Sequence, residues 1–323
     1  MPRQAKLVQH KTLIIYFSAL MLLSSLAAFI INTRFYAYTG CIYVSIDFIY
    51  ISCVTFAMYL GCVLHFGRNK IPTLILREFF FFTMVINILM LGVNSAQWTP
   101  FLPIDLYLIR WERLVKIDTP ELLNWTAHHT TIKQILCFCY DSLAVQLFIL
   151  PFLIILTQRF YLLREHYALL FISGLIGFTF YYFFPTTAPA SVFNSPYFTA
   201  DQHSTGLKFI EIHQHIPPST NQGGMIAMPS FHVIWAWLSQ YLLREWSLAF
   251  YTLLPINLCL VIACVMLGWH YGVDILSSVI VLVISHWICA QGIQPRQWTM
   301  SRIIKWATSK RSKSGSENHT SIQ

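Results

Sequence analysis

Long runs of apolar residues constrain this chain more than any other feature. A transmembrane helix needs roughly 20 mostly apolar residues, because the hydrocarbon core of a bilayer is about 30 Å thick. We expect crossings at residues 12–31, 41–65, 79–93, 140–157, 168–184, 229–243, 248–267 and 273–289. The sequence therefore predicts an all-α fold, a polytopic membrane helix bundle with about eight transmembrane helices.

The composition agrees with this prediction. Of the 323 residues, 56% are hydrophobic and 11% are charged, whereas an ordinary soluble domain has about 25% charged residues. So few charges exclude a single water-soluble globule, and the high hydrophobicity excludes a disordered chain. The eight cysteines fall mainly within apolar runs and have no paired C-x-x-C spacing, so we expect neither a disulfide framework nor a zinc site.

The positive charges predict the orientation in the membrane. The net charge is +8, which in a soluble protein would suggest a nucleic-acid partner. In a membrane protein it is typical of cytoplasmic segments rich in Lys and Arg. With eight crossings, most of the 21 Lys and Arg residues lie on the side of both termini. We therefore expect both termini in the cytoplasm and no nucleic-acid partner.

Three regions follow from these patterns. We expect an N-terminal three-helix membrane region at 1–97, a catalytic membrane domain at 98–290 and a basic cytoplasmic tail at 291–323. Residues 98–116 alternate apolar and charged side chains in the manner of an amphipathic helix at the outer membrane interface. Residues 184–227 contain five prolines and are interpreted as a long polar loop on the same side, of a length that is usually functional or disordered.

Two short stretches carry chemically active residues at outer helix ends. One reads MPSFH and contains Ser230 and His232, and the other reads GWHYGVD and contains His270 and Asp274. His270 and Asp274 are four residues apart and so share one helix face. The carboxylate can accept a hydrogen bond from Nδ1 and leave Nε2 as a nucleophile, while His232 serves as acid or base. Because helix N-termini also bind anions, the pattern predicts phosphoryl transfer through a phosphohistidine.

These motifs resemble the second and third signature motifs of the type 2 phosphatidic acid phosphatase superfamily. The stretch YYFFPTTAPA at 181–190, together with Asp105 and the segment after it, resembles the inositol phosphorylceramide synthase branch. The resemblance implies that His270 is the nucleophile, that Asp274 orients it and that His232 protonates the leaving group. It also implies that Ser230 contacts phosphate, and that the reaction needs no metal and no cofactor.

The chain departs from the phosphatase branch at its cationic positions. Gly177 and Phe184 stand where that branch has Lys and Arg, and Cys264 stands where an Arg is frequent. The inositol phosphorylceramide synthase branch also lacks these cations, which favours a phosphotransferase. A phosphate ester still needs positive charge away from water. The candidates on the outer side are Lys208, which we expect to bind substrate, and the alternatives Arg110, Arg113 and Lys116.

We therefore expect an integral membrane phosphotransferase that acts on the headgroup of a phospholipid or sphingolipid at the extracytoplasmic leaflet. A lipid phosphate phosphatase would use the same catalytic residues. A non-catalytic lipid transporter or scramblase would explain the missing cations, and a haem protein with His232 and His270 as axial ligands would show a Soret band. The sequence leaves protein partners open.

Overall fold

The described residues are almost entirely helical. The computed structural model describes residues 3–39, 46–220 and 226–292, which form eleven α-helices and one short 3-10 helix and contain no strand. The all-α prediction is confirmed. The basic tail predicted at 291–323 lies, apart from its first two residues, outside the described residues.

Within the described residues, seven helices are long and apolar enough to cross a membrane, which makes the chain an integral multi-pass membrane protein. They are α1 (Arg3–Arg34), α2 (Ile46–Phe66), α3 (Ile71–Gln97), α6 (Thr130–Leu156), α7 (Phe160–Phe183), α10 (Ser247–Met266) and α11 (Gly272–Gln291). The remaining predicted crossing, at 229–243, forms α9 (Phe231–Leu242). With 12 residues, α9 is about 18 Å long and shorter than the hydrocarbon core.

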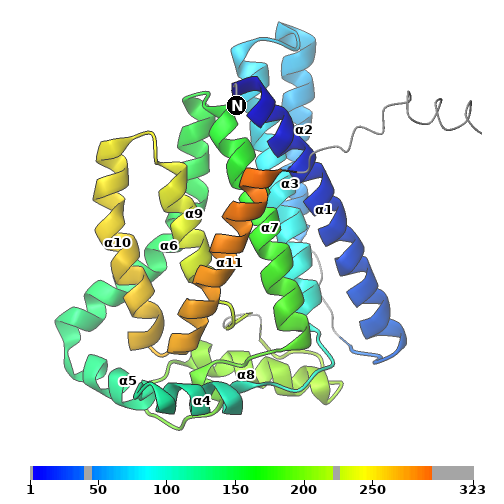
Figure 1. Ribbon diagram of the computed structural model, residues 1–323. Helices are drawn as coiled ribbons and strands as arrows, with labels where there is room; N and C mark the ends of the chain where they lie inside the picture. The colour runs from blue at the N-terminus through cyan, green and yellow to red at the C-terminus, as the bar shows by residue number, and fades with distance from the viewer. Residues whose placement is uncertain (1–2, 40–45, 221–225, 293–323) are drawn as a thin grey trace, which may run out of the picture.

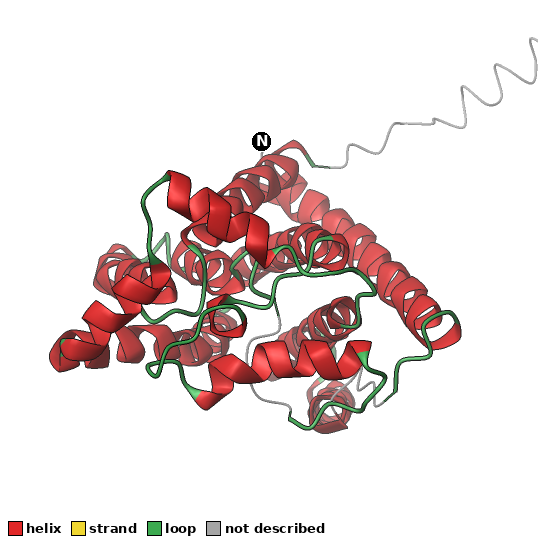
Figure 2. Cartoon of the chain, turned by 90° about the horizontal axis from the view of Figure 1, so that it is seen from below, coloured by secondary structure: helices red, strands yellow, loops and turns green. Residues whose placement is uncertain are grey.

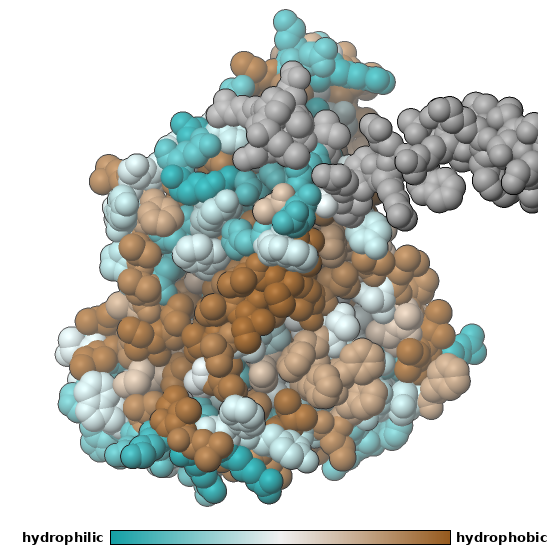
Figure 3. All heavy atoms as spheres, viewed as in Figure 1, coloured by the Kyte–Doolittle hydropathy of each residue, from teal (hydrophilic) through white to brown (hydrophobic). Residues whose placement is uncertain are grey.

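The outer surface of the bundle is apolar at mid-height. Hydrophobic side chains form a broad band across the face shown in Figure 3, and hydrophilic side chains gather at both ends. Large side chains such as Leu64 and Val283 point outward, at 87% and 63% exposed. In a soluble protein such a surface would aggregate, whereas here it matches lipid.

Helix α7 is the centre of the bundle. It packs against α1 and α3 on one side and against α9 and α11 on the other, and it is buried along most of its length. A single hydrophobic cluster runs from Met21 on α1 through Phe171 on α7 to Ile234 on α9. Helices α1 and α3 therefore share one core with the rest of the chain, and α2 packs against α3.

Short helices cover one end of the bundle. Figures 1 and 2 show α4 (Asp105–Leu114), α5 (Thr119–His128) and α8 (Ala200–His213) lying across the end at which α9 and α11 begin. Helix α4 falls inside the segment 98–116 predicted to be an amphipathic helix, and it is shorter than that segment.

The interpretation of 184–227 as a loop without secondary structure is wrong, because it contains α8 and the 3-10 helix Pro189–Ser191. Helix α8 begins with a capping box, in which Thr199 and Gln202 each accept the backbone N–H of the other, at 2.8 and 3.3 Å. The Gln202 side chain also donates to the carbonyl of Leu267 at 2.8 Å. This contact ties α8 to the turn between α10 and α11.

Candidate active site

The two sequence motifs meet at the covered end of the bundle. Helices α9 and α11 both begin there (Figure 1), which places His232 in the first turn of α9 and His270 just before α11. Their ring centroids are 5.8 Å apart and their planes are inclined at 62°. The structure therefore brings together the two imidazoles that the sequence predicts to flank a phosphate.

His270 presents one ring nitrogen to two acceptors. Its Nδ1 lies 2.8 Å from the carbonyl oxygen of Ala227 and 3.3 Å from Oδ2 of Asp274. A backbone carbonyl can only accept a hydrogen bond, so Nδ1 carries the proton. Nε2 then keeps its lone pair, as a nucleophile requires. The ring is only 4% exposed, so little water competes with these contacts.

Asp274 is fully buried in the first turn of α11. Besides His270, its Oδ2 accepts the backbone N–H of Tyr271 at 2.9 Å, and the helix N-terminus favours the negative charge. The carboxylate is thus held on the helix face that carries His270. This is the arrangement that the spacing of four residues predicts.

A second buried carboxylate, Asp105, links three segments around the site. It accepts the backbone N–H of Thr187 at 2.9 and 3.1 Å and the hydroxyl of Tyr271 at 3.0 Å. Next to it, the Thr186 hydroxyl accepts the backbone N–H of Met228 at 2.9 Å. Burial raises the pKa of Asp105, and these hydrogen bonds counteract part of that effect. Asp105 therefore joins α4, the 184–190 segment and the start of α11.

Glu112, which the sequence analysis did not single out, supports the same helix start. Its Oε1 accepts the backbone N–H of Gly272 at 2.6 Å and its Oε2 accepts the hydroxyl of Thr119 at 2.9 Å. Burial raises the pKa of Glu112. In the sequence, Glu112 stands out only as a charged residue of the amphipathic segment 98–116. That position does not distinguish a carboxylate that caps a helix from one that is exposed to solvent.

His232 is positioned by an aromatic stack that sequence reasoning also missed. Its ring stacks on Tyr140 of α6 with a centroid distance of 4.2 Å, and Tyr140 stacks on Trp269 at 5.5 Å. The Tyr140 hydroxyl lies 3.4 Å from Nδ1 of His232. The stack fixes the plane of the imidazole relative to His270.

Ser230 immediately precedes α9 and is fully buried. Its hydroxyl donates to Sγ of Cys264 at 4.0 Å, which places it against α10. Its carbonyl accepts the hydroxyl of Ser278 at 3.1 Å. In this structure Ser230 and Ser278 join α9, α10 and α11. A contact of Ser230 with phosphate stays a prediction.

The candidate cations differ in burial. Lys208 lies on α8 with only 8% of its surface exposed, and burial lowers its pKa. No carboxylate among the described residues forms an ion pair with it. Arg110, Arg113 and Lys116 are exposed on or just after α4. Lys208 is therefore the one of these four whose charge has been withdrawn from water.

The position that carries a Lys in the phosphatase branch belongs to the core here. A Cβ added to Gly177 would lie 2.6 Å from Cζ of Phe231. A side chain at this point would therefore force the Phe231 ring to shift. Phe184, at the position of the Arg, is 49% exposed.

Metal ligands are not grouped within the part of the chain that the structure describes, where no cluster of three His, Cys, Asp or Glu side chains could hold an ion. His213 and His215 have a spacing found in metal sites, but both pack on aromatic rings. The His213 ring stacks on Phe209 at 4.2 Å, and the His215 ring lies 5.5 Å from that of Tyr38.

Comparison with known families agrees with this geometry. A family model described as the PAP2 superfamily matches residues 106–288, a stretch that holds both histidines, Asp274, Ser230 and Lys208. Neither the curated proteins nor the solved structures gave a match. Helices α1 to α3 precede the matched residues. Since the match covers more than half of the chain and both motifs, this membrane protein belongs to the PAP2 superfamily.

Proposed function

We propose that the protein is a lipid phosphotransferase that works through a phosphohistidine on His270. The observation that carries the proposal is the pair of acceptors on Nδ1, the Ala227 carbonyl and Asp274, which leaves Nε2 free beside the His232 ring. This is the arrangement that nucleophilic catalysis by histidine requires. We assign the reaction to the region 98–290 and a supporting role to the N-terminal membrane region 1–97.

The first half-reaction transfers the phosphoryl group to the protein. Nε2 of His270 attacks phosphorus, an N–P bond forms, and the P–O bond to the glycerol oxygen of the donor breaks. His232 carries a proton when the anionic donor lies beside it and gives that proton to the glycerol oxygen, so that neutral diacylglycerol leaves. The phosphorylated ring of His270 carries positive charge, which Asp274 stabilises.

The second half-reaction regenerates the protein. An acceptor hydroxyl gives its proton to His232, its oxygen attacks phosphorus and the N–P bond breaks. If the acceptor is a lipid alcohol the protein is a transferase. If the acceptor is water and the donor is a phosphatidic acid, inorganic phosphate leaves and the protein is a lipid phosphate phosphatase. The absence of cations at Gly177, Phe184 and Cys264 supports the inositol phosphorylceramide synthase branch, and hence a lipid acceptor.

The residues that bind the phosphate and the orientation of the protein in the membrane belong to the same proposal. Lys208 supplies positive charge from α8, and Ser230 reaches the phosphate after a change of its rotamer. The distribution of Lys and Arg supports an extracytoplasmic position of the histidine pair. The reaction uses no metal and no cofactor, because His270 is itself the nucleophile and His232 the acid.

The test is a transfer assay with the purified full chain. Phosphatidylinositol with labelled phosphorus is supplied with and without ceramide. We expect labelled inositol phosphorylceramide when ceramide is present and an acid-labile phosphoprotein when it is absent. His270→Gln should abolish both products. His129→Gln, which changes an exposed histidine at the same end of the bundle, should abolish neither.

Two results would contradict the proposal in different ways. Release of inorganic phosphate from labelled phosphatidic acid, with no transfer from phosphatidylinositol to ceramide, would establish the phosphatase alternative. Lipid movement between leaflets that continues in His270→Gln, with no turnover by either protein, would establish the non-catalytic transporter.

A further inference from the structure

A long groove runs along the bundle from the histidine pair. It lies between α9, α10 and α11 and has a volume of about 550 Å³, well within the range of ligand-binding pockets. Val233, Ala236 and Gln240 of α9 form its floor. Leu258 of α10 and Val283 of α11 are among the side chains of its two walls. We call this feature the tail groove.

The tail groove exists because two helices diverge. Helices α10 and α11 each pack against α9, but Figure 1 shows that they spread apart away from the turn that joins them. Side chains on both walls are therefore exposed, with Leu258 at 57%, Val279 at 47% and Val283 at 63%. In the membrane these side chains open toward lipid.

One end of the tail groove adjoins the candidate active site. Its first residues on α9 and α11 are Val233 and Ile275, which directly follow His232 and Asp274 in the sequence. A lipid whose phosphorus lies between the two imidazoles therefore has beside it an apolar groove that begins at the next residue of both helices.

The length of the tail groove also suits a lipid chain. From Ile275 to His286, its lining residues on α11 span about 16 Å at about 1.5 Å per residue. One leaflet of the hydrocarbon core is about 15 Å thick. At the far end the Trp237 indole donates to Nε2 of His286 at 3.0 Å. This hydrogen bond joins α9 to α11.

We propose that the tail groove holds one hydrocarbon chain of the donor phospholipid while the phosphate lies between His232 and His270. The inference rests on the proposed function and adds to it the donor's binding site. The occupant is the donor and not the acceptor, since only the donor's phosphorus must lie between both imidazoles in the first half-reaction.

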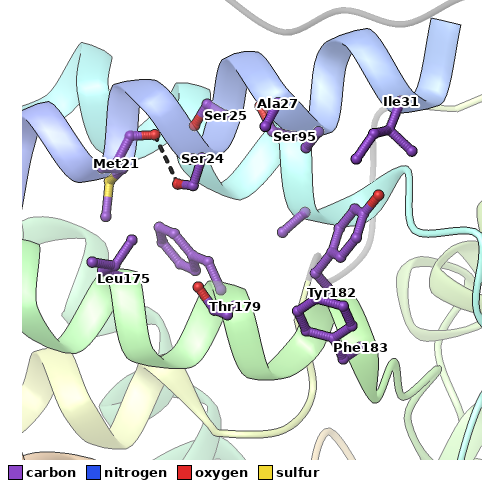
Figure 4. Close-up of a pocket in the computed structure, with 14 residues that line it drawn as sticks. Met21, Ser24, Ser25, Ala27, Ile31, Ser95, Leu175, Thr179, Tyr182 and Phe183 are labelled. Carbon is purple, nitrogen blue, oxygen red and sulfur yellow. Dashed lines mark hydrogen bonds between the residues drawn. The ribbon is translucent and has the colours of Figure 1, made fainter. Parts of the chain in front are cut away.

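A second cavity offers an alternative. It has a volume of about 210 Å³ and lies between α1, α3 and α7, where Ser24, Ser25 and Ser95 are among its lining residues (Figure 4). Helix α7 separates it from α9. A chain bound there would lie on the other side of α7 from the residues that border the histidine pair.

The first test fills the tail groove. Val279→Trp places an indole on its wall, whereas Ile280→Trp places one on the same helix at a residue that is 52% exposed and outside the groove. The measurement is the ratio of kcat/KM for long-chain phosphatidylinositol to that for a short-chain, water-soluble form. We expect Val279→Trp to lower this ratio about tenfold or more, because excluding about two methylene groups suffices for that. Ile280→Trp should keep the ratio of the unmodified protein.

An unchanged ratio in Val279→Trp, or an equal fall in both variants, overturns the inference. Each ratio is measured within one protein, so it is independent of the amount of folded sample. Failure of the proposed function shows itself differently, as turnover of the short-chain form that survives His270→Gln.

The second test uses the unmodified chain and needs no turnover. Phosphatidylinositol with a photoreactive group at the end of one chain is bound in vesicles and irradiated, and the labelled peptides are identified. We expect the label on α10 and α11 around Leu254 and His286, which line the far end of the groove. Label on the cavity between α1, α3 and α7, label spread over all lipid-facing helices, or no label overturns the inference.

Discussion

Two hydrogen-bond acceptors at different distances hold the proton on Nδ1 of His270. Their distances predict how far a substitution of Asp274 lowers the activity. The Ala227 carbonyl is the nearer, at 2.8 Å against 3.3 Å, and it keeps the tautomer correct even without a carboxylate. We therefore expect Asp274→Asn to lower kcat/KM by roughly 100-fold, less than the roughly 10⁴-fold loss seen where an Asp→Asn change leaves the wrong tautomer. The loss reflects the missing negative charge beside the phosphorylated ring.

The rate of phosphoprotein formation in a single turnover measures this effect directly. Asp141→Asn is the control, since Asp141 is an exposed carboxylate on α6 toward the same end of the bundle. Activity of Asp274→Asn equal to that of the control would show that the carboxylate plays no part in the reaction.

Lys208 predicts a pH dependence. Burial lowers its pKa, so in the free protein it loses its proton, and with it the charge that binds phosphate, at a lower pH than an ordinary lysine. We expect kcat/KM to fall first as His232 loses the proton that it donates, and then more steeply, in a second fall, as Lys208 deprotonates. Lys208→Arg should move that second fall to higher pH, because a guanidinium stays charged.

The measurement is the profile of kcat/KM against pH, which reports groups of the free enzyme. Lys116→Arg, an exposed position beyond α4, is the matched control and should leave the profile in place. An alkaline limb that is the same in Lys208→Arg and the unmodified protein would remove Lys208 from the phosphate site.

Residue by residue, the sequence predicts what is local and misses what is distant. Asp274 could be assigned to His270 because a separation of four residues defines a helix face. The Ala227 carbonyl is 43 residues from His270, and Tyr140 is 92 residues from His232. No spacing rule reaches such partners. They come together only because Tyr140 of α6, the start of α9 and the turn before α11 lie in the same layer of the bundle.

At the scale of elements, the contact between α7 and α9 depends on a glycine. A Cβ at Gly177 would meet Cζ of Phe231 at 2.6 Å and Cγ of Pro229 at 3.0 Å, on either side of Ser230. We expect Gly177→Ala to destabilise the protein by about 1–3 kcal/mol, as overpacking does. We also expect it to lower activity, because Phe231 directly precedes His232.

Thermal unfolding in detergent and transfer activity together test this expectation. Gly61→Ala is the control, since a Cβ there would meet nothing within 4 Å and alanine favours a helix by up to about 1 kcal/mol. Equal stability and activity of the two variants would show that the close approach of α7 and α9 is unimportant.

Element positions were largely predictable, and element ends were not. Every predicted crossing contains a helix because apolar runs of this length have no other stable form in lipid. Helix α3 begins at Ile71, before the predicted 79, because Pro72 favours a helix start there and the buried Glu78 pairs with Arg164 of α7. Helix α8 was missed because its residues are mostly polar, although Thr199 and Gln202 have the spacing of a capping box.

For the whole molecule, the two ends of the bundle differ in how their charges are used. At the end opposite the histidines, Arg164 pairs with Glu78, Arg244 with Glu165, and Arg159 with Glu245. Lys and Arg residues still outnumber the acids at that end, and orientation depends on the number of Lys and Arg residues and hardly on acids. The exposed Arg110, Arg113 and Lys116 at the covered end act against this bias but are fewer than the opposing cations.

The larger number of Lys and Arg residues at the end opposite the histidines predicts that α8 lies outside the cytoplasm. It also predicts that the turn before α10 lies within the cytoplasm. Asp201 and Ser247 are exposed at these two places. In intact cells, a membrane-impermeant thiol reagent should label Asp201→Cys beyond the level given by the native cysteines. It should label Ser247→Cys only after permeabilisation. The reverse pattern would place His232 and His270 at the cytoplasmic leaflet, where the donor lipid would have to be drawn from the inner monolayer.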